Sequence, residues 1–363
     1  MSSTPDSPAP ALRGGAASQQ QRVLVTGAAG VLGSLLCARL LEAGFAVRGL
    51  SLPNDALRAR IEPLGCEIWE GDIRDPASLR GICQGVDSVF HLAAIIISHD
   101  VSLFRQINFE GTAHLLREAD RAGAGHFVYV SSASVSYPRL TPYAQSKLDA
   151  ERLVSARAGD FTIVRPTLVY DRHGSREVTM FLNYLRRFPI VPFIGKGDAL
   201  KRPVWSEDIV DGLTRLAGNP IAFGKTYNFS GAEAITIRDF AHLLLRVHGA
   251  DRPFLHLPVA PLRAAALLMQ SLMAEPPLTL NAIAGVVHHA NLDPSEAVRD
   301  LGYAPIGVRA GFARLFAPAA DGGASPRPTG GVAPGARERD ASAPPAVART
   351  VTNGKSERTV NQV

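Results

Sequence analysis

Cysteine is scarce in this 363-residue chain, which holds three: Cys37, Cys66 and Cys83. Their odd number and wide spacing argue against a disulfide framework, and no histidine stands at a metal-ligand spacing from them. The sequence therefore predicts buried thiols in a reducing compartment and no metal site. The first residues lack the basic and apolar regions of a secretory signal, and no uncharged run reaches the ~20 residues of a membrane span. We expect a soluble cytoplasmic protein.

A stripe of Lys and Arg interleaved with aromatic residues is also missing, so the formal net charge of +5 does not indicate a nucleic-acid partner. The last 46 residues alone carry six Lys/Arg against four Asp/Glu. Residues 1–20 and 318–363 contain few large apolar side chains and cannot offset their ordering entropy by burial. We therefore predict two disordered tails around a folded part of roughly 300 residues.

From residue 22 onward, short β-branched runs alternate with amphipathic segments, the pattern of a parallel sheet covered by helices. The expected strands are Arg22–Thr26, Ala46–Leu50, Cys66–Glu70, Ser88–Leu92, His126–Ser131 and Phe161–Arg165. The expected helices between them are Val31–Ala43, Pro76–Cys83, Val101–Ala122 and Tyr143–Ala156. This order predicts the α/β class, with a Rossmann-type doubly wound parallel sheet.

The rhythm loosens after residue 175, where we predict a smaller C-terminal α/β lobe that binds the substrate. Its expected pieces include helices at Val178–Arg187, Ser206–Ala217 and Ile237–Val247, a short piece at Thr226–Phe229, and an apolar stretch at Pro261–Met273. The predicted division is therefore a dinucleotide-binding core over 21–175, which returns in part later in the chain, and a lobe over 176–317.

Three glycines follow the first expected strand and open the first helix, at Gly27, Gly30 and Gly33. Gly27 permits a tight turn, Gly30 lets the backbone approach a pyrophosphate at the helix N-terminus, and Gly33 allows helix and strand to pack closely. A strand before the motif and a helix after it favour a dinucleotide site over a ligand-free turn.

The residue after the second strand separates NAD from NADP, because an acid there binds the ribose hydroxyls and repels a 2′-phosphate. Here that residue is Ser51, which excludes neither cofactor. Arg48 or Arg58 could lie near a 2′-phosphate, although exposed arginines are usually only solvated. The choice stays open, with a slight lean to NADP.

Tyr143 and Lys147 are four residues apart at the start of an expected helix, which places phenol and ammonium on one face. A free phenol has a pKa near ~10, so a phenolate at pH 7 requires about 4 kcal/mol of stabilisation, which a neighbouring ammonium helps to supply. Ser131, Ser132 and Ser134 follow the preceding strand and could place a hydroxyl beside the substrate oxygen.

Seven motifs occur in the order typical of the extended short-chain dehydrogenase/reductase family. They are Thr26-Gly27-x-x-Gly30-x-x-Gly33, Gly71-Asp72-Ile73-Arg74-Asp75, His91-Leu92-Ala93-Ala94, Asn108-x-x-Gly111-Thr112, Ser131-Ser132, Tyr143-x-x-x-Lys147 and Arg165-Pro166-Thr167. Over roughly residues 21–317 the chain resembles the NAD-dependent epimerase/dehydratase branch of that family.

The resemblance implies a role for each matching residue. Tyr143 corresponds to the catalytic acid/base, Lys147 to the residue that lowers its pKa and holds the nicotinamide ribose, and Ser132 to the hydroxyl that bonds the substrate oxygen. The implied cofactor-binding positions are Gly27, Gly30, Gly33, Ser51, Asp72, Ile73, Ala93, Ala94, Lys147, Pro166 and Thr167. The chain departs from the family at two places. Ser51 replaces the usual acidic or basic selector, which leaves the choice between NAD and NADP open. The loop between Ser132 and Tyr143 has only ten residues, which leaves the choice of substrate open.

Arg202 lies in a segment that resembles the family's diphosphate-binding stretch, and a guanidinium can bond two phosphate oxygens. A solvated arginine explains the residue about equally well. We therefore expect an NAD(P)-dependent nucleotide-sugar epimerase or 4-keto-sugar reductase. The alternatives are a sterol-type, 3-beta-hydroxysteroid-like alcohol dehydrogenase, suggested by the apolar segments 188–194 and 261–273, and a non-catalytic dinucleotide-binding scaffold. Peripheral membrane contact and a homodimer stay open.

Overall fold

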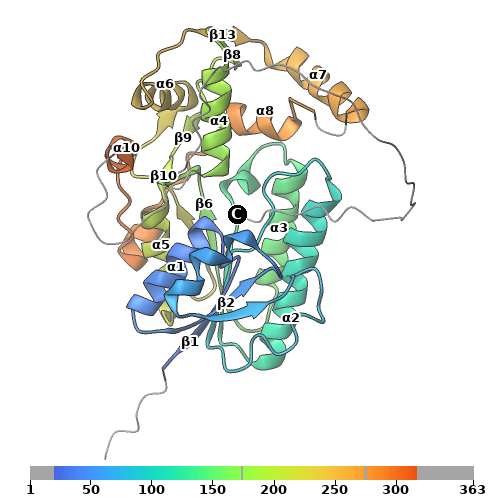
Figure 1. Ribbon diagram of the computed structural model, residues 1–363, viewed down its shortest axis with the longest axis vertical. Coiled ribbons are helices and arrows are strands. Elements are labelled where there is room, and N and C mark those ends of the chain that lie inside the picture. Colours follow the sequence, from blue (N-terminus) through green and yellow to red (C-terminus); the bar gives the residue numbers. More distant parts are fainter. Residues whose placement is uncertain (1–19, 173–174, 274–275, 317–363) are drawn as a thin grey trace, which may run out of the picture.

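A seven-stranded parallel sheet forms the centre of the computed structural model, which describes residues 20–172, 175–273 and 276–316 (Figure 1). The spatial order β11-β6-β5-β4-β1-β2-β3 reverses direction between β1 and β4, as in a doubly wound sheet. The predicted fold class is therefore confirmed. The strands are β1 (Arg22–Thr26), β2 (Ala46–Ser51), β3 (Glu67–Glu70), β4 (Ser88–His91), β5 (His126–Val130), β6 (Asp160–Pro166) and β11 (Lys225–Phe229).

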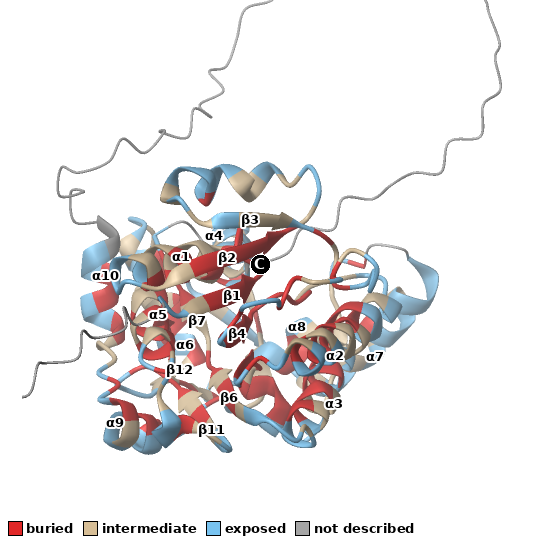
Figure 2. Cartoon of the chain, turned by 90° about the horizontal axis from the view of Figure 1, so that it is seen from below, coloured by how far each residue is buried: buried red, intermediate tan, exposed pale blue. Residues whose placement is uncertain are grey.

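Helices cover both faces of this sheet, and each face has its own hydrophobic core. The helices α1 (Val31–Glu42) and α5 (Ser206–Thr214) share one core. The other core contains buried side chains of α2 (Thr112–Ala122) and α3 (Pro142–Ser155). Figure 2 shows the inner strands β1, β2 and β4 as buried. The sheet therefore forms a rigid layer whose carboxyl ends can present side chains to a ligand.

The rest of the chain builds a smaller lobe around a third core, which α4 (Arg176–Arg187), α6 (Ile237–Val247) and α10 (Val308–Phe316) enclose. Three strand pairs support it: β7 (Val169–Tyr170) with β10 (Val204–Trp205), β8 (Val191–Ile194) with β13 (Phe254–Leu257), and β9 (Leu200–Lys201) with β12 (Ile235–Thr236). The remaining helices are α7 (Val259–Leu272), α8 (Leu280–Val287) and α9 (Ser295–Leu301), with short 3-10 turns at Ala56–Arg60, Glu62–Leu64, Ala133–Ser136 and Pro220–Ala222. A domain boundary at residue 175 stays a prediction, and the predicted tails lie outside the described residues except for residue 20.

Two sequence expectations are corrected by the structure. The helix expected at Pro76–Cys83 is wrong: successive turns with i to i+3 hydrogen bonds occupy this segment, and Gly81 at φ 84° interrupts any helical winding. The short piece expected within the lobe at Thr226–Phe229 is β11, which pairs with β6 as the seventh strand of the central sheet. The helix expected at Val101–Ala122 is present, but Phe104–Gly111 winds as a π-helix.

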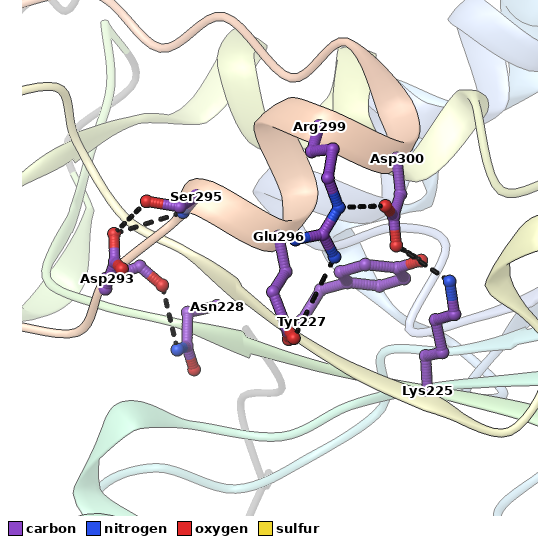
Figure 3. A network of polar contacts seen from close by, with 8 residues as sticks. All are labelled: Lys225, Tyr227, Asn228, Asp293, Ser295, Glu296, Arg299 and Asp300. Atoms are coloured by element: carbon purple, nitrogen blue, oxygen red, sulfur yellow. Dashed lines mark hydrogen bonds and ion pairs between the residues drawn. The ribbon is translucent and has the colours of Figure 1, made fainter.

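A polar network holds α9 against β11 (Figure 3). Asp300 accepts hydrogen bonds from the Lys225 ammonium at 2.8 Å, the Tyr227 hydroxyl at 3.0 Å and the Arg299 guanidinium at 2.8 Å. These donors hold the pKa of Asp300 well below its usual range. These contacts fix the edge strand β11 to α9, a helix more than 65 residues later in the chain. They also protect this edge of the sheet.

We predict that Gly33→Ala destabilises the protein by about 1–3 kcal/mol. A Cβ at this position would lie 2.0 Å from the Gly27 carbonyl oxygen, so α1 would have to move away from the turn. Urea unfolding measures the effect. The matched control is Gly285→Ala in α8, where a Cβ meets nothing within 4 Å and helix propensity favours Ala. Equal stability of both variants would contradict the packing described here.

Candidate active site

The glycine turn after β1 brings the N-terminus of α1 to the carboxyl edge of the sheet. Gly27 has φ 67°, and a Cβ there would lie 2.9 Å from the Ala93 backbone nitrogen. Gly30 caps α1 without a side chain, so its first turn has no side-chain acceptor at this position. Exposed N–H groups at a helix N-terminus attract phosphate. The cradle that a Cβ would fill thus fits the pyrophosphate of a dinucleotide.

A buried histidine links the two strands that flank the switch point. His91 at the end of β4 bonds Thr26 of β1 through Nδ1 at 2.7 Å and Thr112 of α2 through Nε2 at 2.9 Å. Burial, with Lys147 nearby, lowers the pKa of His91 to about 3, so the ring is neutral. The Thr26 hydroxyl also accepts from the Ala93 backbone N–H at 3.2 Å. This network fixes the path of the backbone at Ala93.

Asn108 in the π-helical segment joins the loop after β4 to α3. Its side chain accepts from the Ile95 N–H at 2.8 Å and donates to the Ile95 carbonyl at 3.0 Å. It also donates to the Ser146 hydroxyl at 3.1 Å, which in turn donates to the Tyr143 carbonyl at 2.7 Å. Asn108 and His91 stand in the family motifs, but the sequence did not reveal these positioning contacts.

The structure brings Ser132, Tyr143 and Lys147 together at the carboxyl end of β5. Ser132 begins the turn after this strand, and its hydroxyl accepts from the Ser134 N–H at 3.2 Å. The same hydroxyl is near enough to the Tyr143 phenol to lower its pKa. Tyr143 lies in the first turn of α3, which Thr141 caps by accepting from the Ala144 N–H at 3.2 Å. One turn later, the buried Lys147 ammonium donates to the Val130 carbonyl at 2.7 Å.

Burial favours the neutral form of both titratable groups, so it shifts their pKa values in opposite directions. It raises the pKa of the Tyr143 phenol above its usual value, an effect that the nearby Glu177 carboxylate increases and the nearby Ser132 hydroxyl reduces. It lowers the pKa of Lys147 to about 7. In the protein alone the phenol therefore holds its proton, while the lysine titrates near neutral pH.

Glu151 is a positioning residue that the sequence reasoning missed. It lies one further turn along α3 and forms a bidentate ion pair with Arg165 of β6, at 2.9 and 2.6 Å. Its negative charge offsets part of the effect of burial on the Lys147 pKa. The spacing Tyr143, Lys147, Glu151 at i, i+4 and i+8 was the available signal, because these positions share one helix face.

A second polar group faces the site from the lobe. Burial lowers the pKa of Lys201 to about 8, and Lys201 donates to the His288 carbonyl. The His288 ring lies 5.2 Å from that of Tyr137, in the loop between Ser132 and Tyr143. Glu177, at the start of α4, contributes the negative charge that Lys201 and Tyr143 both experience. Tyr137, His288 and Lys201 thus connect the loop between Ser132 and Tyr143 to the lobe.

The other expected cofactor-binding residues lie along the same edge of the sheet. Ser51 is buried at the end of β2. Asp72 pairs with Arg74, whose Nε lies 2.9 Å from the carboxylate. Ile73 is buried, and a Cβ on Gly111 would lie 2.7 Å from it. Pro166 ends β6 and Thr167 follows it. Their contacts to a cofactor stay a prediction.

The arginines invoked for NADP have protein partners. Arg48 is buried, with Nε bonded to Glu67 at 2.9 Å and Nη1 to the Gln84 carbonyl at 3.2 Å. Arg58 pairs with Glu62 at 3.0 Å and with Glu70. These contacts remove the support that both guanidinium groups gave to NADP and leave the cofactor phosphate undetermined.

Arg202 is likewise held by protein acceptors. Its Nε donates to the Asn291 side chain at 2.7 Å, and its Nη1 lies 3.1 Å from the Ala232 carbonyl and 3.4 Å from the Gly231 carbonyl. A guanidinium has five N–H donors, so part of this fork already serves the fold. The geometry supports the structural reading of Arg202 more than the diphosphate reading.

A family model decides the relationship that the motifs indicate. Residues 23–229 match the NAD dependent epimerase/dehydratase family. The chain belongs to this family. The resemblance expected from the motifs is thus confirmed, and with it the assignment as an NAD(P)-dependent enzyme of the extended short-chain dehydrogenase type.

Three similar proteins illustrate the range of this family. The chain is 30% identical to sterol demethylase protein B of Methylococcus capsulatus, covering 81% of this chain and 97% of the relative. It is 28% identical to 3 beta-hydroxysteroid dehydrogenase/Delta 5→4-isomerase of Mycobacterium tuberculosis, covering 78% and 86%. Among solved structures, DesIV of Streptomyces venezuelae, a dTDP-glucose 4,6-dehydratase with NAD and TYD bound, matches with a TM-score of 0.65 at 25% identity, covering 81% and 95%.

We predict that, as the pH is raised, the activity of Glu151→Gln declines at a lower pH than the activity of the wild type. Removing the carboxylate removes the charge that supports the Lys147 ammonium, so the pKa of Lys147 falls further below its ordinary value. At pH 7.5, kcat/KM should fall about three- to tenfold, while at pH 6 the difference should shrink. The measurement is the pH profile of kcat/KM.

Asp149→Asn is the control for this experiment, since Asp149 lies on the same helix and bonds the exposed Gln145 and Arg152 side chains. Its profile should overlay that of the wild type. A Glu151→Gln profile of unchanged shape would show that Glu151 does not act through Lys147.

Proposed function

We propose that this protein is an NAD(P)-dependent oxidoreductase that interconverts a secondary alcohol and a ketone on an apolar, sterol-like substrate. The observation that carries the proposal is the placement of the Ser132 hydroxyl and the Tyr143 phenol at the carboxyl end of β5, one helical turn from the buried Lys147. A scaffold that only binds a dinucleotide needs no acid/base pair with an ammonium buried one turn below it.

In this proposal each side chain acts on the substrate oxygen or on its neighbour. The Tyr143 phenol donates a proton to the carbonyl oxygen during reduction and removes it during oxidation. The Ser132 hydroxyl bonds the same oxygen and holds it within reach of the phenol. Lys147 stabilises the phenolate when it forms and contacts the nicotinamide ribose. The nicotinamide supplies or accepts hydride when bound, as NAD or NADP.

Two features support an apolar substrate over the nucleotide sugar favoured by the sequence. The Arg202 guanidinium already bonds Asn291 and backbone carbonyls, which weakens it as the anchor of a diphosphate. The names of the two relatives above refer to sterols or steroids, and their similarity extends through the lobe.

A nucleotide-sugar epimerase or 4-keto-sugar reductase is the second candidate. Its support is the overall likeness to DesIV, a dTDP-glucose 4,6-dehydratase. In that case the same Tyr143 and Ser132 would act on a sugar hydroxyl, and a cation of the lobe would hold the diphosphate.

We predict that Tyr143→Phe lowers kcat by about 10²- to 10⁴-fold, because it deletes the proton donor and keeps the ring. Cofactor affinity, measured by fluorescence titration, should stay within about twofold. Lys147→Ala should lose both turnover and cofactor affinity, since Lys147 is assigned two roles. Full activity of Tyr143→Phe would refute the mechanism, and normal cofactor binding by Lys147→Ala would refute the ribose contact.

Arg202→Ala separates the two substrate classes in a panel of steroid alcohols and nucleotide sugars. For an apolar alcohol, KM should change less than about twofold, whereas loss of a charge-assisted diphosphate contact raises KM roughly 10- to 150-fold. Asn291→Ala is the matched control, because it removes the protein partner of Arg202 without removing a cation. Turnover of a nucleotide sugar alone, with a raised KM in Arg202→Ala only, would overturn the apolar-substrate proposal.

A further inference from the structure

Most of the large hydrophobic side chains exposed by the described residues lie in two segments of the lobe. Eight of the eleven are found in residues 178–197 and 252–273. They are Met180, Tyr184, Ile190, Leu255, Leu267, Leu268, Leu272 and Met273. Single exposed apolar residues are ordinary, but a concentration of this kind marks an interaction surface.

The two segments are joined in space. The strand β8 pairs in parallel with β13, where Leu255 lies opposite Pro192. The helix α7 follows β13 directly and packs on α8, which contacts β8. Figure 1 shows β8, β13 and α7 at the end of the molecule that is remote from the central sheet. We call the exposed side chains of residues 178–197 and 252–273 the apolar lobe face.

The helix α7 contributes the most exposed part of this face. Ala266 is its one buried residue, whereas Leu267, Leu268 and Leu272 are 58%, 61% and 75% exposed. Arg263 is the one charged residue among its 14. Figure 2 shows much of α7 as exposed. A helix this apolar would normally bury its leucines in a core, yet none of the described residues covers Leu267, Leu268 and Leu272.

The charges of the same segments have one sign. Residues 178–197 and 252–273 contain Arg186, Arg187, Lys196, Arg252 and Arg263 and no Asp or Glu, while Glu177, Asp198 and Asp251 stand at their borders. Two copies of this face against each other would bring ten cations together with carboxylates only at the borders of the face, which disfavours a homodimer here. A surface that combines exposed leucines with an excess of arginines instead matches the boundary of an anionic lipid layer, where apolar side chains enter the acyl region and cations meet the headgroups.

We infer that the apolar lobe face docks on the surface of an anionic lipid bilayer, with Leu267, Leu268 and Leu272 inserted and the arginines at the headgroups. The contact is peripheral, since no described helix is long and apolar enough to cross a membrane. The inference is independent of the proposed substrate, because it concerns adsorption of the protein.

The test is flotation of the full-length protein with vesicles of phosphatidylcholine alone or mixed with phosphatidylglycerol, without substrate. The protein should float with the mixed vesicles, bind phosphatidylcholine alone at least tenfold more weakly, and lose affinity as salt rises. Absence of binding to the mixed vesicles would overturn the inference.

Two sets of variants identify the surface. The triple variant Leu267→Ser, Leu268→Ser and Leu272→Ser should bind the mixed vesicles at least tenfold more weakly. Replacing Arg186, Arg187 and Arg252 by Gln should weaken binding about fivefold for each residue. The control pair Ile221→Ser and Val298→Ser removes exposed apolar side chains outside the face and should bind as the wild type does.

All variants should keep the wild-type melting temperature, because the substituted side chains are exposed. Binding that survives the leucine variant but disappears in the arginine variant would show charge attraction without insertion and overturn the inference. So would a leucine variant that converts a dimer to a monomer, by light scattering, without changing vesicle binding. Turnover of a steroid alcohol dispersed in detergent tests the proposed function separately.

Discussion

The site depends on holding one ammonium group inside the protein. A buried charge costs several kcal/mol unless nearby groups compensate it. Around Lys147 these are the Val130 carbonyl at 2.7 Å, the face of the Tyr129 ring at 4.3 Å and the charge of Glu151 one turn along α3. The compensation is partial, which places the pKa of Lys147 at about 7. The positions of β5 and α3, and hence of the phenol, follow from the contacts that this ammonium requires.

The neighbouring polar groups are arranged so that few of them titrate with Lys147. His91 is neutral across the physiological range because burial and the ammonium both disfavour its charged form. Asn108 has no charge and bonds both backbone groups of Ile95. Neutral hydrogen bonds thus position the cofactor side of the site, while the pH response is concentrated in Lys147. This separation lets the backbone geometry stay constant as the lysine changes its protonation state.

Local pattern predicted the sheet and the central site, because strand alternation, glycine turns and the i, i+4 pair are encoded within a few residues. What it missed depends on distant residues. The strand β11 was placed in the lobe, since its pairing with β6 and its tie to Asp300 join segments about 65–75 residues apart. The protein partner of Arg202 was missed for the same reason, because Asn291 lies 89 residues later in the chain. The wrong helix at Pro76–Cys83 has a different cause. Gly81, which adopts a positive φ, was a local signal against a helix, but the helical spacing of the apolar residues was given more weight.

The helix α4 relates the proposed chemistry to the proposed membrane contact. Its first turn carries Glu177, whose charge acts on Tyr143, and its last turn carries Arg186 and Arg187 of the apolar lobe face. Glu177 and Arg186 are nine residues apart, which corresponds to about 14 Å along the helix. The Tyr143 phenol and the lipid headgroups at Arg186 would therefore be separated by roughly the length of α4. An apolar substrate with its oxygen at Tyr143 and its body along the lobe could then span the interval between site and bilayer. A diphosphate would instead have to lie between the two, beside a cation that the fold does not already use.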